Sequence, residues 1–451
     1  MRKLKGFIAI ATTVLIAACQ QTVPAESESL SADIAVINAN VVRVGESNTP
    51  ILSQRAVLIS DDKIKQVVPM AAVQQLPEST RIIDANDGYL LAGFTEMHGH
   101  VPPATDFGQF PKRYADDMLF LYLANGVTTV RGMLGYPHQL QLKQDIAEGK
   151  RMGPTLYLAG PSFNGNTIES VEQATQRVIE HRSQGWDLLK IHPGLSLSEY
   201  QALAATARAE AMDFAGHVPA DVGLEVAMTE GQRTIDHLDG YLEYVDAINR
   251  PITDDELQRL VQLTIEHQIA VVPTQALWAT LIGAEDPQQL ATYPELDLVP
   301  QVVREGWLNY YQQPSMGYFN TEHAATQQAN RQRLLKALYE GGAEIIFGTD
   351  APQLFSVPGY SIHHEINKMQ QAGIPLKDIY ASATVAAGDY FAEDEFGKIS
   401  AGHRADFMLL KNNPLVSADA LKEPQGVMVR GTWLARQDID AKLAEIRAAY
   451  R

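Results

Sequence analysis

Through the middle of this chain of 451 residues, short apolar runs alternate with longer segments of helical period. The helical stretches include residues 171–184, 197–211 and 254–267, where apolar side chains recur every three to four positions. Strand–helix alternation of this kind predicts parallel strands joined by right-handed crossover helices. The eight strands predicted in this way are Phe94–His98, Val127–Arg131, Thr155–Leu158, Leu188–Ile191, Asp213–His217, Thr234–His237, Ala270–Val272 and Glu344–Phe347.

The number and spacing of these units predict the central domain. Eight strand–helix units over about 250 residues are typical of a (β/α)8 TIM barrel, and we place this barrel at residues 92–395. The alternative is an open doubly wound sheet. A glycine-rich phosphate fingerprint does not follow the first predicted strand, which disfavours the dinucleotide-binding form of that alternative. The predicted fold class is therefore α/β.

The segments on either side of the predicted barrel have a different residue pattern, in which short β-branched runs are separated by turn residues. Residues 33–91 contain several such runs, and the same pattern returns at 406–410 and 426–430. The last segment, residues 436–451, is predicted to be a C-terminal helix. Strand-forming segments therefore flank the predicted barrel on both sides.

The N-terminus has the pattern of a secretory signal. A basic start precedes an apolar stretch of about 13 residues, which is shorter than the roughly 20 needed to span a bilayer. Residues 1–18 resemble a bacterial lipoprotein signal, after which Cys19 is expected to carry a lipid. The alternative is an ordinary signal peptide cut nearby. Residues 19–32 are small and polar, as in a flexible tether. We therefore expect a protein secreted across the inner membrane and anchored in the cell envelope, facing the periplasm.

Composition excludes several classes of protein. One cysteine cannot form an internal disulfide framework or a cysteine-rich zinc module. The formal net charge of −18 argues against a nucleic-acid partner. The hydrophobic share of 45% is enough for a packed core. The oligomeric state cannot be read from the sequence.

Side chains of metal-binding types stand where the predicted strands end. His98 and His100 are two residues apart, so on an extended chain both point to the same side. One histidine at a strand end is more often a core residue than a ligand, but the C-terminal ends of barrel strands all meet at one mouth. Imidazole and carboxylate groups there suit zinc or another divalent transition metal. The residues that converge in this prediction are His98, His100, Lys190, His217, His237 and Asp350.

Lys190 is unusual in this set because its ammonium group would repel a metal ion. At about 4 Å from a divalent cation and an effective dielectric near 20, the repulsion is roughly 8 kcal/mol. A buried lysine can lose its proton and then add carbon dioxide to become a carbamate, which is an anion. The alternative is an ion pair inside the barrel with Asp350 or Asp239.

Three stretches of the sequence resemble the amidohydrolase superfamily, in the binuclear branch that is similar to imidazolonepropionase-related and prolidase-like enzymes. They are LAGFTEMHGH at 91–100, GVTTVRG at 126–132 and FGKISAGHRADF at 396–407. The resemblance covers nearly the whole chain after the tether. It implies a barrel with a small β-sandwich that pairs residues 33–91 with residues 396–435.

The resemblance also implies roles for the converging residues. His98, His100 and Asp350 would hold a first metal ion, and His217 and His237 a second. Both ions are expected to be divalent, with zinc as the first candidate. Lys190, as a carbamate formed with CO2, would bridge them together with a hydroxide. Asp350 would take a proton from this nucleophile and pass it to the leaving nitrogen.

Two positions depart from the family pattern. Glu96 stands two residues before the first metal histidine, where the family usually has Asp, and Gly132 follows Arg131 where many relatives have Asp. Residues 278–320 are long enough for an active-site lid, with a packed surface excursion as the equal alternative. The residues predicted to contact substrate are Arg131, His192, Tyr241, Tyr244 and His364.

Three functions compete at this point. The first is a metal-dependent hydrolase of small amides, such as dipeptides or N-acyl amino acids. The second is a mononuclear hydrolase of cyclic C–N bonds, similar to imidazolonepropionase, with Lys190 unmodified. The third is a catalytically silent envelope protein that binds ligands on the same scaffold, although such a protein could have lost any of these ligand residues.

Overall fold

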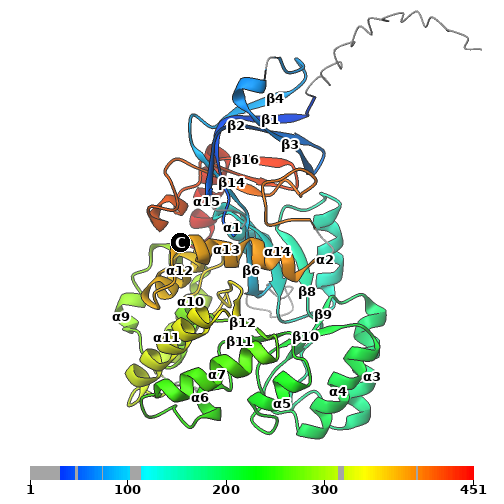
Figure 1. The fold of residues 1–451 in the computed structure, drawn as a ribbon, viewed down its shortest axis with the longest axis vertical. Helices are drawn as coiled ribbons and strands as arrows, with labels where there is room; N and C mark the ends of the chain where they lie inside the picture. Colours follow the sequence, from blue (N-terminus) through cyan, green and yellow to red (C-terminus); the bar gives the residue numbers. More distant parts are fainter. Residues whose placement is uncertain (1–30, 46–48, 74, 102–112, 313–318, 393–394) are drawn as a thin grey trace, which may run out of the picture.

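The computed structural model describes residues 31–45, 49–73, 75–101, 113–312, 319–392 and 395–451. The predicted signal 1–18, Cys19 and most of the predicted tether lie outside these residues. Within them, a β-sheet built from both ends of the chain lies at one end of the molecule, and the mixed α/β body lies at the other (Figure 1). None of the helices in these ranges is both long and apolar enough to cross a membrane.

The terminal sheet has eight strands. Its two parts meet where β14 pairs antiparallel with β5, with Phe407 opposite Ala92. At the opposite edge of the sheet, β3 forms backbone hydrogen bonds with the segment before β14. One of them runs from Ile64 N to His403 O (2.8 Å). The sheet therefore curls around a buried apolar cluster. Its strands are β1 (Ile34–Val42), β2 (Ile51–Ser60), β3 (Lys63–Pro69), β4 (Arg81–Asp84), β5 (Tyr89–Ala92), β14 (Phe407–Leu410), β15 (Gly426–Val429) and β16 (Thr432–Ala435).

The body contains eight parallel strands, one at each position predicted from the sequence. Three form one sheet in the order β6-β7-β8, and five form another in the order β13-β12-β11-β10-β9. All neighbouring pairs within these sheets are parallel. The strands are β6 (Phe94–Gly99), β7 (Val127–Gly132), β8 (Thr155–Leu158), β9 (Leu188–Ile191), β10 (Asp213–Gly216), β11 (Thr234–Asp236), β12 (Ala270–Val272) and β13 (Glu344–Ile345).

Backbone hydrogen bonds join the two parallel sheets at both edges of the smaller one. At the β8 edge, Asp187 N donates to Leu158 O (3.0 Å). At the β6 edge, Met97 N donates to Phe347 O (3.0 Å), and Asp350 N donates to His98 O (2.6 Å). The C-terminal ends of β6 and β13 are therefore held side by side.

Local capping explains why the connecting helices begin where they do. Ser170 accepts a hydrogen bond from Gln173 N at the start of α3 (Val171–Gln184), which ends at Gly185 with φ +88°. Reciprocal capping boxes begin α4 (Leu197–Ala209) and α7 (Asp254–Glu266). Signals of this type can be read from sequence, and these three helices lie at the predicted positions.

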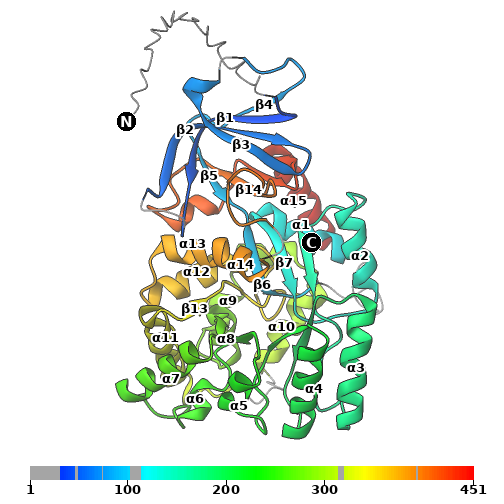
Figure 2. The ribbon, with the colours of Figure 1, turned by 45° about the vertical axis from the view of Figure 1, so that its right-hand side comes forward.

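The remaining helices include several short ones. The excursion from Trp278 onwards contains parts of α8, then α9 and α10, and Trp278 itself is buried. The last helix, α15, lies against α1 beside the terminal sheet (Figure 2). The helices are α1 (Tyr114–Ala124), α2 (His138–Ala147), α5 (Leu224–Thr229), α6 (Tyr241–Tyr244), α8 (Gln275–Leu281), α9 (Pro287–Leu290), α10 (Gln301–Gln312), α11 (Ala324–Gly341), α12 (Ser361–Gln371), α13 (Leu376–Ala383), α14 (Val385–Tyr390) and α15 (Arg436–Tyr450).

Candidate metal centre

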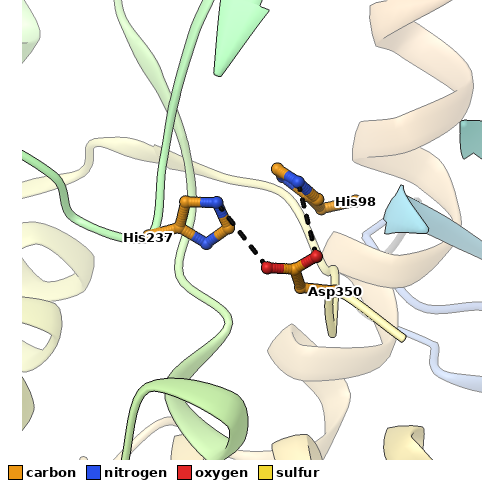
Figure 3. A group of neighbouring side chains, drawn as sticks. All are labelled: His98, His237 and Asp350. Carbon is orange, nitrogen blue, oxygen red and sulfur yellow. Dashed lines mark ion pairs between the residues drawn. The ribbon is translucent and has the colours of Figure 1, made fainter. Parts of the chain in front are cut away.

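Three buried side chains from the strand ends form a group that can hold a metal ion. His98 comes from β6, His237 follows β11 and Asp350 follows β13. Each offers one ligand atom, and these atoms lie within 4.8 Å of one another. Figure 3 shows the Asp350 carboxylate between the two imidazoles, with Oδ1 3.6 Å from His98 Nε2 and Oδ2 3.8 Å from His237 Nε2.

Two of these residues have unusual backbone conformations. His237 has φ +66° and Asp350 has φ +64°, in the left-handed region that non-glycine residues seldom occupy. Hydrogen bonds from His237 N to Val272 O (2.7 Å) and from Asp350 N to His98 O (2.6 Å) hold these conformations. Backbone strain of this kind is typical of functional sites.

The structure brings the other three predicted ligand residues to the same place. His100 Nε2 lies 2.6 Å from Asp350 Oδ1. The His217 and His237 rings have centroids 4.6 Å apart. Lys190 is fully buried, and its Nζ lies 3.1 Å from His98 Nε2. All six predicted ligand residues therefore gather around the ends of β6, β9, β10, β11 and β13.

A polar partner orients the ring of each of three site histidines through its Nδ1 atom. His98 Nδ1 lies 2.7 Å from Asp236 Oδ2, and His217 Nδ1 lies 3.0 Å from Asp239 Oδ2. His237 Nδ1 lies 2.7 Å from Thr274 Oγ1. When Nδ1 is engaged in this way, Nε2 is the nitrogen free to bind a metal ion. Sequence reasoning missed the orienting roles of these partners, although Asp236 directly precedes His237.

The electrostatic setting favours uncharged bases. Burial lowers the pKa of His98 and of His237 well below the usual histidine value. Burial also lowers the pKa of Lys190 to about 8. In addition, His237 Nε2 is buried without a hydrogen-bond partner among the described residues. Neutral nitrogens and one carboxylate are the donor set of a divalent transition metal, so the residues fit such an ion.

Glu96, the departure from the family pattern, ties two strand ends together. Its carboxylate accepts hydrogen bonds from His98 N (3.0 Å), from Thr349 N (2.7 Å) and from Thr349 Oγ1. Burial raises the pKa of Glu96 to about 8. This side chain therefore joins the two strand ends that carry the candidate ligands His98 and Asp350.

Arg131, predicted to contact substrate, is fully buried and binds protein groups instead. Its guanidinium donates to Met97 O, Tyr390 Oη, Thr234 Oγ1 and the Asp236 carboxylate. Through Asp236, these contacts link Arg131 to His98, the histidine that Asp236 orients.

The other four predicted substrate residues lie in different surroundings. The His192 ring stacks on the His217 ring, with centroids 5.1 Å apart, so His192 borders the site. Tyr241 is buried with its hydroxyl 2.9 Å from Thr264 Oγ1. The other two bind acidic side chains. Tyr244 donates to Glu225 (3.0 Å), and His364 lies 2.7 Å from Glu295 in a cavity between α8 and α12.

We compared the chain with protein families, with curated proteins and with solved structures. A model of the amidohydrolase family matches residues 89–434. No curated protein matches the chain in sequence. Similar solved structures include a bottromycin amidohydrolase (22% identity, 92% of this chain and 90% of that chain, TM-score 0.71). They also include an Xaa-Pro dipeptidase with bound methionine in its active site (19%, 89% and 99%, 0.65) and a putative prolidase from Bifidobacterium longum (20%, 92% and 98%, 0.67). At these identities the structural likeness concerns the fold.

Proposed function

Because the chain belongs to the amidohydrolase family, we propose that it is a metal-dependent hydrolase that cleaves C–N bonds of small amides. The observation that carries the proposal is the buried group of His98, His237 and Asp350 at the strand ends. Dipeptides and N-acyl amino acids are the proposed substrates. The resemblance in fold to an Xaa-Pro dipeptidase and a putative prolidase supports this class.

The proposed architecture is a closed (β/α)8 barrel over residues 92–395, with a β-sandwich formed by residues 33–91 and 396–435. The hydrogen bonds that join both edges of the three-stranded sheet to the five-stranded sheet support closure. In such a barrel the catalytic site lies at the C-terminal strand ends, where the six candidate ligand residues gather.

In the proposed centre, two divalent ions are held by residues of this chain, with zinc as the first candidate. His98, His100 and Asp350 would hold one ion, and His217 and His237 the other. When bound, such ions supply Lewis acidity, which acidifies water and polarises a carbonyl group. The neutral nitrogens and the unpartnered Nε2 of His237 support this arrangement.

The chain's own contribution to catalysis is proton transfer and positioning. Asp350 is the proposed catalytic acid–base: its carboxylate takes a proton from the attacking water and delivers it to the leaving nitrogen. Its contact with His100 Nε2 (2.6 Å) and its backbone bond to His98 fix the carboxylate in place. His192, whose ring stacks on that of His217, is the proposed substrate contact.

We propose that Lys190 becomes a carbamate, which would supply an anionic oxygen ligand for the divalent ions. The neutral amine adds CO2, a C–N bond forms, and one proton is released to solvent. Complete burial of Lys190 beside His98 supports this role. We expect Lys190→Ala to lose metal and activity, with partial rescue by a short carboxylic acid. Full metal occupancy in Lys190→Ala would contradict a role of Lys190 in holding the metal.

A mononuclear centre is the second candidate, acting on cyclic C–N bonds with Lys190 unmodified. The observation that favours it is that the tight group contains only three residues, enough for one ion.

We further propose that Cys19 carries a lipid that anchors the protein in the bacterial envelope, facing the periplasm. Labelling with a radioactive fatty acid, lost in Cys19→Ala, tests the anchor.

The first experiment is metal analysis combined with a substrate panel, on the chain from residue 20 onward. Two equivalents of metal per chain support the binuclear centre, and one equivalent supports the mononuclear centre. No metal after incubation with zinc and bicarbonate would favour a silent binding protein. On any dipeptide or N-acyl amino acid that is cleaved, Asp350→Asn is expected to lower kcat by about 10²–10⁴-fold. The matched control is Asp378→Asn, which alters a carboxylate on α13 and should leave kcat unchanged.

A further inference from the structure

We infer that Arg131 is a positioning residue for the metal ligand His98, acts through Asp236, and does not contact the substrate. The inference rests on the proposed function for its consequence in catalysis. The hydrogen bonds that carry it all join groups of this chain.

Arg131 joins three strands and a helix from a fully buried position. Its Nε donates to Met97 O on β6 (2.5 Å), and its Nη1 donates to Tyr390 Oη at the end of α14 (3.2 Å). Its Nη2 donates to Thr234 Oγ1 (3.1 Å) and to both Asp236 oxygens (3.3 Å each), on β11. With its donors engaged by protein groups in this way, Arg131 is poorly placed to bind a substrate.

Asp236 connects Arg131 to His98. Its Oδ2 lies 2.7 Å from His98 Nδ1, and its Oδ1 accepts a hydrogen bond from Thr234 Oγ1 (2.7 Å). Asp236 is fully buried, so its negative charge needs the compensation that Arg131 supplies. Because an ionised carboxylate can only accept a hydrogen bond, this contact with Asp236 places the proton of the neutral His98 ring on Nδ1. The lone pair of Nε2 then points toward Lys190 and Asp350.

The same arrangement is absent from the neighbouring ligand His237. Its Nδ1 is paired with the hydroxyl of Thr274, a neutral group that can donate or accept. The carboxylate that orients His98 is held by Arg131, whereas His217 is oriented by a different carboxylate, that of Asp239, so the loss of Arg131 should affect the ion that His98 holds. Without Arg131, the buried Asp236 carboxylate would lose its compensating charge and the hydrogen bonds from Nη2, and the orientation of the His98 ring would be less strictly held.

The test compares Arg131→Gln with a matched control, Arg404→Gln. Arg404 donates to Thr129 Oγ1 (2.6 Å) on the same strand, β7, and its side chain is also largely buried. Zinc affinity is measured by competition with a chelator. We expect about 10–100-fold weaker binding in Arg131→Gln and unchanged binding in Arg404→Gln. Arg131→Lys keeps the positive charge but not the forked geometry of the guanidinium, so its zinc affinity should lie between those of the wild type and Arg131→Gln.

A second readout works in the metal-free protein. Nitrogen-15 NMR of labelled histidine distinguishes the two imidazole tautomers, and His98→Asn identifies the His98 signals. We expect the Nδ1-protonated tautomer in the wild type and a mixture in Arg131→Gln. If Arg131→Gln does not fold, Asp236→Asn tests the same link.

The outcomes separate this inference from the proposed function. A wild type that binds no zinc contradicts the proposed function, whereas the tautomer measurement still decides the inference. Unchanged zinc affinity together with an unchanged His98 tautomer in folded Arg131→Gln would overturn the inference. A raised KM with both of those unchanged would identify Arg131 as a substrate contact and would also overturn it.

Discussion

The candidate ligand histidines differ in the charge of the group that orients them. Carboxylates engage Nδ1 of His98 and His217, whereas a hydroxyl engages Nδ1 of His237. A carboxylate partner makes the imidazole a stronger donor to a metal ion. In the proposed centre each ion therefore has one carboxylate-supported histidine. This balance would allow two ions to be held with comparable strength.

A buried histidine away from the site makes stability depend on pH. His181 on α3 is buried, its Nδ1 lacks a hydrogen-bond partner in the described chain, and burial lowers its pKa to about 4. The folded state therefore resists protonation. The stabilisation is complete above the unfolded pKa near 6.5 and is lost as the pH falls from there toward 4. Between pH 7 and 5 this group should cost about 2 kcal/mol of unfolding free energy.

The measurement is urea unfolding of wild type and His181→Leu at both pH values. The loss between pH 7 and 5 should be about 2 kcal/mol smaller in the variant, which has no group to protonate there. Parallel losses in the two proteins would contradict a depressed pKa at His181.

At the candidate site, the sequence predicted which side chains gather at the strand ends but not what surrounds them. His98 and Asp350 could be predicted because strand ends converge whatever the side chains are. Arg131 could not, because a residue next to a strand end can point into the mouth or behind it, and only the packing of Tyr390 and Thr234 decides between them. Tyr241 and Tyr244 followed His237 closely in sequence, but the short helix α6 carries them toward other partners.

At the scale of secondary structure, α15 is attached to the body by a buried carboxylate. Asp117 on α1 accepts hydrogen bonds from Arg113 Nε (2.6 Å) and from Tyr450 Oη (2.7 Å). We expect Tyr450→Phe to lower the unfolding free energy by about 1.5–3 kcal/mol, because it removes a buried hydrogen bond to a charged group. Metal content should not change. Thermal or urea unfolding provides the measurement.

The matched control for that prediction is Tyr339→Phe. Tyr339 also donates to a carboxylate, that of Asp378 (2.7 Å), but both residues are half-exposed. Water can replace the lost bond there, so its cost should be below that of Tyr450→Phe. Equal losses in the two variants would show that burial of Asp117 contributes nothing extra.

Elements with strong local signals were predictable, and those fixed by tertiary contacts were not. The eight parallel strands and the capped helices α3, α4 and α7 coincide with sequence predictions. The segment from Trp278 onwards contains part of α8 and all of α9, and these short helices have too few residues for a helical period to be recognised. Trp278 is buried against the His237 ring, with centroids 5.6 Å apart, and beneath Arg331. The start of this excursion is thus packed against the site.

In the whole molecule, segments from both ends of the chain complete one sheet, which lies at one end of the body that carries the candidate metal centre. β5 leads directly into β6, so the pairing of β5 with β14 fixes the strand that bears His98. Folding of the terminal sheet and formation of the site are therefore coupled. Six ligand-type residues from five strand ends can come together only after the body has folded, so metal binding should add to the stability of the folded state alone.

This coupling allows stability to count the bound ions. Metal that binds only the folded chain raises the unfolding free energy by about 1.4 kcal/mol for each tenfold increase in free metal above Kd, per ion. A binuclear centre predicts twice that slope, and chelation should remove the whole gain. Urea unfolding in zinc buffers of defined free concentration gives the slope, and His98→Asn, which removes a proposed ligand of one ion, is the control that should lower it. A slope of zero in the wild type would contradict metal binding at this site, and a slope for one ion would leave Lys190 as an unmodified neighbour of a mononuclear centre.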